Sequence, residues 1–584
     1  MKKKLFLMCC LCIVGVFAYF LFRPALPEPE QNYYADFLPE DTVAVLSLYD
    51  MEGLAKIFPG TPTGRFLSKP VMHEVMGELG AIEEDLEKYD AFYNAVADVL
   101  TSSVFRQVFG DDAVIALCPP NPKGLRGNAE QELKKSLLAF GTSSTAGMIS
   151  RFARMVMRKD VRNAEIAGLD MTRIRLDDNE VLYGYDDHGI IVLAYDPERI
   201  VSAIQRKKSG KTLRNAQSFT ATEAFWKEEG QGHVYARSYL NAIRLQEFAS
   251  VFSQQKTQQG IADMADMADM AEALTAELKS IGSLIIQAQG ELLVLIKGDR
   301  DPELLSKEVQ AKEALLGDEN LALPLLQENT LLHYRLAHFD KAFFRQFLAS
   351  PGTEQQYREL EKTVRNEVGF SLDKFLEATG PRAGISVHDI VNAGMFPLPK
   401  TVLAIQVQNR QAVGWALKKL RDELKKQGFA SEHQENVQGH RLYYWTMMPV
   451  EATHLAIALT DTLLYLANGE SQLRDLLAKK EKPETLTEQV KELGKTAGTC
   501  VASANSGAFL LRPAQLAAQI EPVADWLTDM LWASTTGSGK KIQEELLALM
   551  RSFDFVAACS NRTETHVKGE VIFKTLPGAD QKKK

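Results

Sequence analysis

The alternation of apolar and polar residues along the chain predicts many short strands interspersed with amphipathic helices. Residues 181–204 show this pattern clearly: an apolar strand leads into the polar turn 186–189, a second apolar strand follows, and a helix begins at Pro197. Strands that follow one another through such short turns favour antiparallel pairing. We therefore expect an α+β fold, with helices packed on a mainly antiparallel sheet, rather than a doubly wound parallel sheet.

The same pattern recurs in the second half of the chain. Residues 181–204 align without a gap on residues 454–477, with Leu182 opposite Leu455. The same order of elements extends in both directions, pairing 38–58 with 326–347, 111–120 with 381–390, 136–159 with 401–426, 232–240 with 506–514, and 283–298 with 555–573. This repetition indicates a tandem duplication of two related α+β units, each with its own antiparallel sheet and packed helices.

The repeat and the local composition divide the chain into segments. The predicted segments are a cytoplasmic stub at 1–4, a transmembrane signal anchor at 5–22, a linker at 23–36, the first repeat unit at 37–300, a polar connector at 301–321, the second repeat unit at 322–577, and a basic tail at 578–584.

The anchor is predicted from an uninterrupted apolar run of 18 residues at 5–22. Such a run is long enough to cross a hydrocarbon layer about 30 Å thick. Three lysines at 2–4 precede it, so the positive-inside rule places the amino terminus in the cytoplasm and the body outside, in the periplasm of a bacterium. A cleaved signal peptide is the alternative, since Val16 and Ala18 match the small residues of a cleavage site.

Charge and motifs argue against nucleic acid and nucleotide partners. Asp and Glu outnumber Lys and Arg by 76 to 67, which gives a net charge of -9, whereas a nucleic-acid surface needs a basic footprint. The segments 210–212 and 539–540 resemble parts of a phosphate-binding loop, but Gln205 and Ser534 stand where its leading glycine is required. We expect neither kind of partner.

Three cysteines lie outside the apolar run, namely Cys118, Cys500 and Cys559. An odd and sparse set of this kind is no disulfide framework, although one pair can form in an oxidising compartment. The sequence leaves open which two residues would pair.

The chain carries fragments of catalytic and metal motifs, and none is complete. Ser538 and Lys541 have the spacing of a Ser-x-x-Lys dyad, but they lie in a loop of small residues, whereas the dyad needs a helical turn. His73 and Glu74 lack the second histidine of a zinc-protease helix. We therefore predict no catalytic, cofactor-binding or metal-binding residue and no cofactor, and we favour a role other than catalysis.

Two further segments carry alternatives. Met264, Met267 and Met270 belong to a perfect triplet repeat. Their thioethers are ligands that select Cu(I), so one interpretation is a copper site. The simpler interpretation is an amphipathic helix with a buried stripe of Met and Ala. Tyr443 and Trp445 share one face of an expected strand. An open face there would stack a sugar or a peptide, and the alternative is a strand covered on both faces.

Three segments together carry a family resemblance: 37–42 with its following strand, 63–67, and the strand-turn-strand-helix block at 181–204. They resemble an uncharacterised bacterial family, a domain of unknown function, whose members are exported and have a single amino-terminal membrane anchor. This resemblance implies an anchored extracytoplasmic protein and leaves its activity open.

These observations lead to three hypotheses about function. The first is a non-catalytic binding or scaffold module of the cell envelope, anchored in the membrane through 5–22, with an envelope protein, lipid or polymer as partner. The second is an envelope hydrolase whose site is assembled from residues far apart in the sequence. The third is Cu(I) handling through Met264, Met267 and Met270.

Overall fold

The structure is a computed structural model that describes most of the chain after residue 31. The described residues are 32–50, 58–101, 112–142, 161–175, 180–253, 277–288, 290–303, 305, 325–327, 329–336, 353–393, 396–428, 431–446, 448–478, 495–532 and 539–576. Among the helices of these residues, none combines the length and the apolar character that a membrane crossing requires. The predicted anchor at 5–22 and the basic tail at 578–584 lie outside the described residues.

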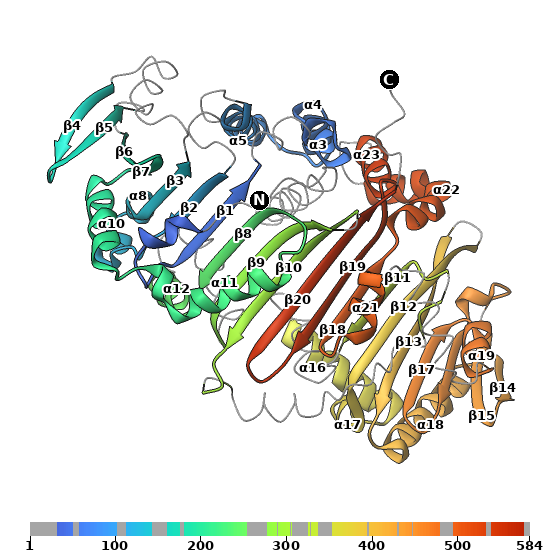
Figure 1. The fold of residues 1–584 in the computed structure, drawn as a ribbon. Coiled ribbons are helices and arrows are strands. Elements are labelled where there is room, and N and C mark those ends of the chain that lie inside the picture. The colour runs from blue at the N-terminus through green and yellow to red at the C-terminus, as the bar shows by residue number, and fades with distance from the viewer. Residues whose placement is uncertain are drawn as a thin grey trace.

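Within the described residues, twenty strands form one antiparallel sheet (Figure 1). The first half of the chain contributes β1 (Ala44–Tyr49), β2 (Asp112–Leu117), β3 (Leu137–Thr142), β4 (Val161–Ile166), β5 (Leu169–Arg175), β6 (Val181–Asp187), β7 (Ile190–Ala194), β8 (His233–Asn241), β9 (Leu278–Ala288) and β10 (Glu291–Arg300). The second half contributes β11 (Leu332–Leu336), β12 (Thr379–Ala393), β13 (Phe396–Val407), β14 (Ser431–Val437), β15 (His440–Thr446), β16 (Leu455–Leu459), β17 (Leu463–Asn468), β18 (Gly507–Leu511), β19 (Phe553–Arg562) and β20 (His566–Thr575).

The strand order is the same in both halves when each is read from its outer edge inward. The first half runs β4-β5-β6-β7-β3-β2-β1-β8-β9-β10. The second half runs β14-β15-β16-β17-β13-β12-β11-β18-β19-β20. The α+β class and the antiparallel pairing are therefore confirmed.

The expectation of a separate sheet for each unit is wrong, because the innermost strands pair with each other. β10 and β20 are antiparallel and in register from Glu291 opposite Lys574 to Asp299 opposite His566. They hold the same position in their two halves, so their pairing relates the halves by an approximate two-fold axis near Leu295 and its partner Glu570.

One hydrophobic cluster, here called the shared core, crosses this junction. It includes Leu293 and Leu295 from the first half and Ala557 and Ile572 from the second. Alternate residues of a strand point to opposite faces, so these side chains lie on one face of the joined sheet. Burial of apolar surface at the junction therefore stabilises both halves together.

Helices cover both faces of the sheet in different places (Figure 1). The first half contains α3 (Pro62–Phe66), α4 (Lys69–Glu78), α5 (Glu83–Thr101), α7 (Pro122–Gly127), α8 (Ala129–Ser136), α10 (Pro197–Ser209), α11 (Gln217–Glu229) and α12 (Ala242–Ser253). The second half contains α16 (Thr353–Thr363), α17 (Leu372–Ala378), α18 (Arg410–Gln427), α19 (Glu470–Ala478), α21 (Lys495–Ser503), α22 (Pro513–Trp532) and α23 (Lys540–Met550). α10, α11 and α21 bury their apolar sides in the shared core, α19 packs on the same face further out, and α18 covers the opposite face.

The ends of α10 follow directly from its sequence. The Asp196 side chain accepts a hydrogen bond from the Glu198 backbone N–H, and Pro197 occupies the first turn, where its missing N–H has no intrahelical partner to lose. Gly210 ends the helix with a φ of 73°, a left-handed conformation that suits glycine. The predicted helix start at Pro197 is confirmed.

The disulfide joins Cys500 of α21 to Cys559 of β19, with Cα atoms 5.5 Å apart. Cys118 is buried as a free thiol, and burial raises its pKa to about 11. The single pair that the sequence allowed is thus Cys500 with Cys559. Both residues belong to the second half, where the disulfide fixes α21 on the sheet.

Candidate functional site

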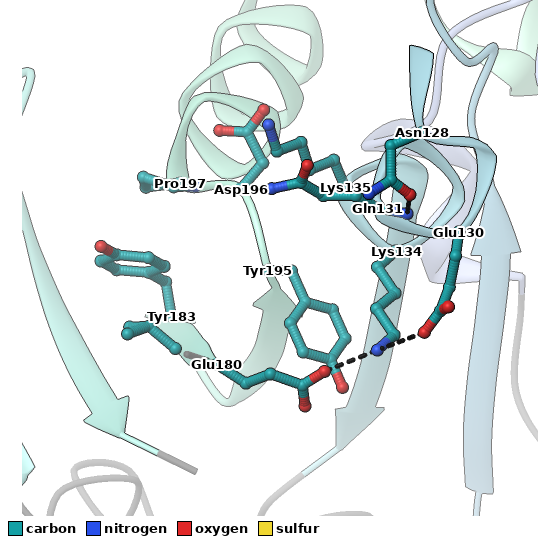
Figure 2. A pocket seen from close by; sticks show the side chains of 11 residues that line it. Asn128, Glu130, Gln131, Lys134, Lys135, Glu180, Tyr183, Tyr195, Asp196 and Pro197 are labelled. Atoms are coloured by element: carbon teal, nitrogen blue, oxygen red, sulfur yellow. Dashed lines mark hydrogen bonds and ion pairs between the residues drawn. The ribbon is translucent and has the colours of Figure 1, made fainter. Parts of the chain in front are cut away.

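A cavity of about 740 Å³ lies in the first half, between α8 and the strands β6 and β7 (Figure 2). One wall comes from α8 and the residue before it: Asn128, Glu130, Gln131, Lys134 and Lys135. The other wall comes from the start of β6 and the turn into α10: Glu180, Val181, Tyr183, Tyr195, Asp196 and Pro197. The cavity is therefore framed by two helix starts and two strand ends.

Helix capping fixes the polar rim of the cavity. Asn128 precedes α8 and its side-chain oxygen accepts a hydrogen bond from the backbone N–H of Gln131 at 3.0 Å. Asp196 has the same role at the start of α10. Side chains used in this way are held in one orientation, so the rim is organised before any ligand arrives.

Lys134 joins the two walls. Its ammonium lies 3.0 Å from a carboxylate oxygen of Glu130, one turn away on α8, and 2.5 Å from one of Glu180, which precedes β6 (Figure 2). The hydrogen bonds to Glu180 and Glu130 raise the pKa of Lys134. The cation is thus retained between two anions at neutral pH.

Two tyrosines give the cavity an aromatic character. In Figure 2 the ring of Tyr195 lies between Tyr183 and Lys134. Both rings are half-buried and line the cavity. Aromatic faces of this kind pack on apolar faces of a ligand, while the surrounding amides and charged groups bind its polar edges.

At the equivalent place in the second half, polar groups of the chain contact one another. Val181 aligns with His454, whose Nδ1 lies 2.9 Å from a Glu470 oxygen and whose Nε2 lies 2.8 Å from the Met448 carbonyl oxygen. Both ring nitrogens face acceptors, an arrangement that favours the doubly protonated ring. Burial lowers the pKa of His454, but the hydrogen bonds to Glu470 and Met448 outweigh this effect and raise it.

The helices of the cavity wall are a feature of the first half. α7 and α8 occupy the connection from β2 to β3. In the second half, two residues separate the end of β12 at Ala393 from the start of β13 at Phe396, so no helix fits there. The wall that α8 contributes to the cavity therefore has no counterpart between β12 and β13.

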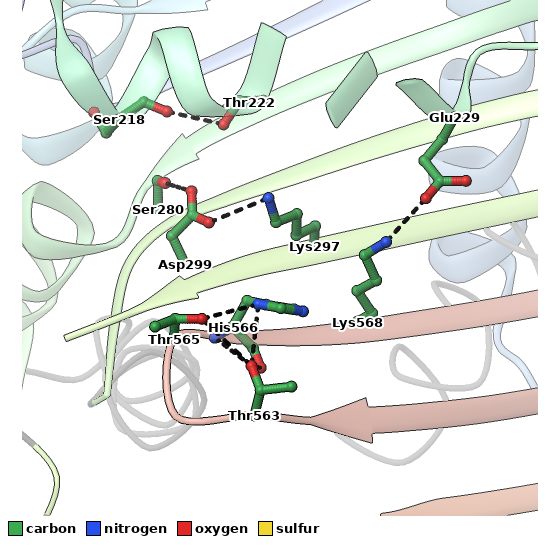
Figure 3. A network of polar contacts seen from close by, with 10 residues as sticks. All are labelled: Ser218, Thr222, Glu229, Ser280, Lys297, Asp299, Thr563, Thr565, His566 and Lys568. Atoms are coloured by element: carbon green, nitrogen blue, oxygen red, sulfur yellow. Dashed lines mark hydrogen bonds and ion pairs between the residues drawn. The ribbon is translucent and has the colours of Figure 1, made fainter. Parts of the chain in front are cut away.

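A second polar network lies over the junction of β10 and β20 (Figure 3). Lys568 of β20 forms an ion pair of 3.0 Å with Glu229 of α11, and Lys297 lies 3.7 Å from Asp299. Burial, together with the charges of Lys297 and Lys568, lowers the pKa of His566. The Lys568–Glu229 pair joins the two halves, whereas Lys297 and Lys568 stand directly opposite each other across the junction.

The aromatic strand singled out from the sequence is β15, and it is covered on both faces. Trp445 is 2% exposed and packs with Tyr443 against α18, while Tyr444 packs on the side of α19. The Arg421 guanidinium lies 3.7 Å from the centre of the Tyr443 ring. The covered-strand alternative is confirmed, and this strand is no open platform for a sugar or a peptide.

The motif fragments have ordinary partners where the structure describes them. His73 lies 2.7 Å from Asp90, and Lys541 forms ion pairs with Glu74 and Glu545. Ser538 lies outside the described residues, so the structure gives no distance between Ser538 and Lys541.

Two groups concern metals. Met264, Met267 and Met270 lie outside the described residues, and the Cu(I) hypothesis stays a prediction. In the described part of the chain, Cys500, Cys559 and Glu570 bring potential ligand atoms within 4.8 Å of one another. The disulfide engages both sulfurs, so this group offers a metal no thiolate.

No family model and no curated protein matches the chain. Among solved structures, crystal form III of TP0453 is similar at 9% sequence identity. The match covers 47% of this chain and 83% of that chain, with a TM-score of 0.23.

Proposed function

We propose that the chain is a membrane-anchored extracytoplasmic protein of the cell envelope, built by tandem duplication, whose body is a non-catalytic binding module. We further propose that the cavity beside α8 binds a saccharide unit of an envelope polymer. The apolar run at 5–22 with its preceding lysines supports the anchor and its orientation. The matching strand orders of the two halves support the duplication.

The observation that carries the binding role is the difference between the halves. In the second half, His454 contacts Glu470 and the Met448 carbonyl at the equivalent place. The first half keeps it open and adds a helical wall. A structural duplicate with one open copy is the arrangement expected when one half holds the ligand and the other extends the sheet.

The lining of the cavity favours a saccharide. Tyr183 and Tyr195 supply aromatic faces for the C–H face of a sugar ring, while Asn128 and Gln131 supply amides for its hydroxyls. Three carboxylates and two ammonium groups also line it, and the ion pairs of Lys134 leave little net charge to attract a strongly ionic ligand.

The test is calorimetric titration with oligosaccharides of N-acetylglucosamine, a common envelope sugar unit. Tyr183→Ala and Tyr195→Ala should each weaken binding about tenfold, which corresponds to about 1.4 kcal/mol for a lost ring contact. Tyr185→Ala is the matched control, because Tyr185 lies on the same strand but does not line the cavity. No binding, or equal losses for all three variants, would refute the assignment.

A second candidate is hydrolysis, favoured by the two carboxylates that share Lys134. Glycoside hydrolases use a pair of carboxyl groups, and one of them must deliver a proton. Here Glu130 and Glu180 both accept from the same ammonium, an arrangement suited to holding two charges rather than to proton transfer. Release of reducing ends from the same oligosaccharides, abolished by Glu180→Gln, would establish this candidate instead.

The anchor is tested separately by fractionation and mass spectrometry of the full chain. We expect the protein to stay in the membrane fraction after a high-salt wash and to retain its first 23 residues. A version that starts at Asn32 should leave the membrane fraction. Recovery of a shortened chain from the envelope would show that the apolar run is a cleaved signal peptide.

A further inference from the structure

Four basic side chains are buried on two neighbouring strands of the second half. His333 and Arg335 of β11 are 0% and 1% exposed, and Arg382 and His388 of β12 are 8% and 2% exposed. The register places His333 opposite Ser386 and Arg335 opposite Gly384. Residues two apart on a strand share a face, so His333 and Arg335 lie on one face of β11. His388 and Arg382 lie close enough for their charges to act on His333 and Arg335.

At three of the four matching positions the first half has a neutral residue, and at the fourth Asp112 stands where Arg382 stands. Val45 and Ser47 of β1 stand where His333 and Arg335 stand in β11, and Cys118 stands where His388 stands. The shared core runs without interruption across β1 and β2. On the same face of the second half, apolar clusters end at β18 and resume at β13, and the basic residues fill the gap between them.

Arg335 and His333 are incompletely satisfied. His333 Nδ1 lies 2.7 Å from the Ser386 hydroxyl, and Arg335 Nη1 donates to the Ala504 carbonyl. Arg335 Nη2 and His333 Nε2 are buried without a hydrogen-bond partner, and among the described residues no carboxylate forms an ion pair with Arg335. A buried guanidinium with no anion beside it is strongly unfavourable, so the arrangement calls for one.

The electrostatics agree with a site of positive potential. Burial, followed by the charge of Arg382, lowers the pKa of Arg335 to about 10. Burial, followed by the charges of His388 and Arg335, lowers the pKa of His333 to about 3. Both shifts have the direction that a bound anion would reverse.

We propose that this basic cluster binds a small inorganic oxyanion, phosphate or sulfate, with Arg335 as its principal ligand and His333 Nε2 and Arg382 beside it. A guanidinium presents parallel donors that match two oxygens of such an ion. The surrounding side chains are buried, so a small free ion suits this place better than a group carried by a larger molecule. This site lies in the half opposite to the saccharide cavity, and the two proposals are independent.

The experiment uses the full chain and two readouts. Ion chromatography identifies any phosphate or sulfate released when the purified protein is denatured. Thermal unfolding is then followed against sodium sulfate or sodium phosphate, with sodium chloride at equal ionic strength as reference. We expect either stoichiometric release of an oxyanion or an unfolding midpoint that rises with oxyanion concentration beyond the chloride effect.

Arg335→Met should remove the oxyanion response, and it should make the anion-free protein more stable because a buried unpaired charge is lost. Arg335→Lys keeps the charge but loses the parallel donors of the guanidinium, so it should weaken the apparent affinity for the oxyanion at least about tenfold, the loss expected for one charge-assisted hydrogen bond. If Arg335→Met does not fold, the Arg335→Lys variant provides the test. Arg162→Met, an exposed change on β4, is the matched control and should respond like the unmodified chain.

The proposal is overturned if no oxyanion is released and the unmodified chain responds to sulfate and phosphate no more than to chloride. It is equally overturned if the position 335 variants and the unmodified chain respond alike.

Discussion

Ile572→Ala tests whether the two halves fold as one unit. Ile572 lies on β20 and is 0% exposed in the shared core, opposite Leu293 of β10. Ile296 of β10 is the matched control, because it lies on the other junction strand but is 40% exposed on the opposite face of the sheet. Both isoleucines are replaced by alanine, so the two changes remove the same atoms.

The structure sets different magnitudes for the two changes. Removing three buried carbons at Ile572 forfeits about 2.4 kcal/mol of transfer free energy at about 0.8 kcal/mol each. The cavity left in a packed core raises the loss in free energy of unfolding to about 3 to 4 kcal/mol. At Ile296 fewer contacts are lost and no closed cavity forms, so we expect about 1 kcal/mol.

The assay is equilibrium unfolding in urea, followed in parallel by circular dichroism and tryptophan fluorescence. The shared core draws residues from both halves, so we expect the two probes to report coincident transitions that Ile572→Ala shifts together. Two separate transitions, with only one moved by Ile572→Ala, would show that the halves unfold independently. Equal effects of the two alanine changes would refute the burial argument.

Three further predictions concern pH, redox state and packing. The pKa of His454 is raised in the folded state, so protonated His454 stabilises the fold fully below its ordinary pKa of 6.5. This stabilisation is lost as the pH rises through the raised pKa. The urea midpoint should therefore fall above pH 6.5 in the unmodified chain but not in His454→Gln. Identical pH profiles would contradict this. Reduction of Cys500–Cys559, which are 59 residues apart, should lower the free energy of unfolding by about 4 kcal/mol, as judged by the urea midpoint with and without a phosphine reductant. An unchanged midpoint would contradict it. In Gly282→Ala the added carbon meets a methyl carbon of α11 at 2.6 Å, so we expect the free energy of unfolding to fall by about 2 kcal/mol. Gly77→Ala in α4 adds a carbon in open space and should raise the free energy of unfolding by about 0.5 kcal/mol. A thermal melt that ranks the two variants in reverse would refute the packing argument.

Local chemistry made the repeated block at 181–204 predictable. The turn at 186–189 contains His188 and Gly189, both at positive φ, which is the conformation of a tight hairpin turn, and the cap at Asp196 marks the start of α10. These signals act within a few residues of each other. The strand-turn-strand-helix order therefore follows from sequence alone.

Exact residue pairing between the halves was less predictable. The alignment of 136–159 with 401–426 places Phe140 opposite Ile405. In the sheet, Phe140 pairs with Val192, and it is Ala404 that pairs with the equivalent residue Tyr465. The connection that precedes β3 holds two helices, whereas only two residues separate β12 from β13, so the sequences slip by one residue there.

The joining of the halves and the cavity depend on distant contacts. The run Leu292–Leu295 is apolar at successive positions, which is typical of a strand that is covered on both faces of the sheet. Nothing in the local sequence, however, indicates that β20 is the strand that pairs with it. The cavity brings Lys134 to Glu180, 46 positions apart. An i, i+4 pair of Glu130 and Lys134 on a short helix is ordinary at the surface, so the sequence gives no reason to single it out.

The pairing of β10 with β20 has the form of an isologous dimer interface enclosed in one polypeptide. A single ancestral unit would have ended in a free edge strand of this kind, ten residues long in β10, and two copies would cover each other's edges by two-fold association. If the two halves arose by fusion of such copies, their association would be independent of concentration, and one half could lose its binding site while still covering the edge strand of the other. A fragment ending at Arg300 should therefore sediment as a dimer or aggregate, and a stable monomeric fragment would argue against this origin.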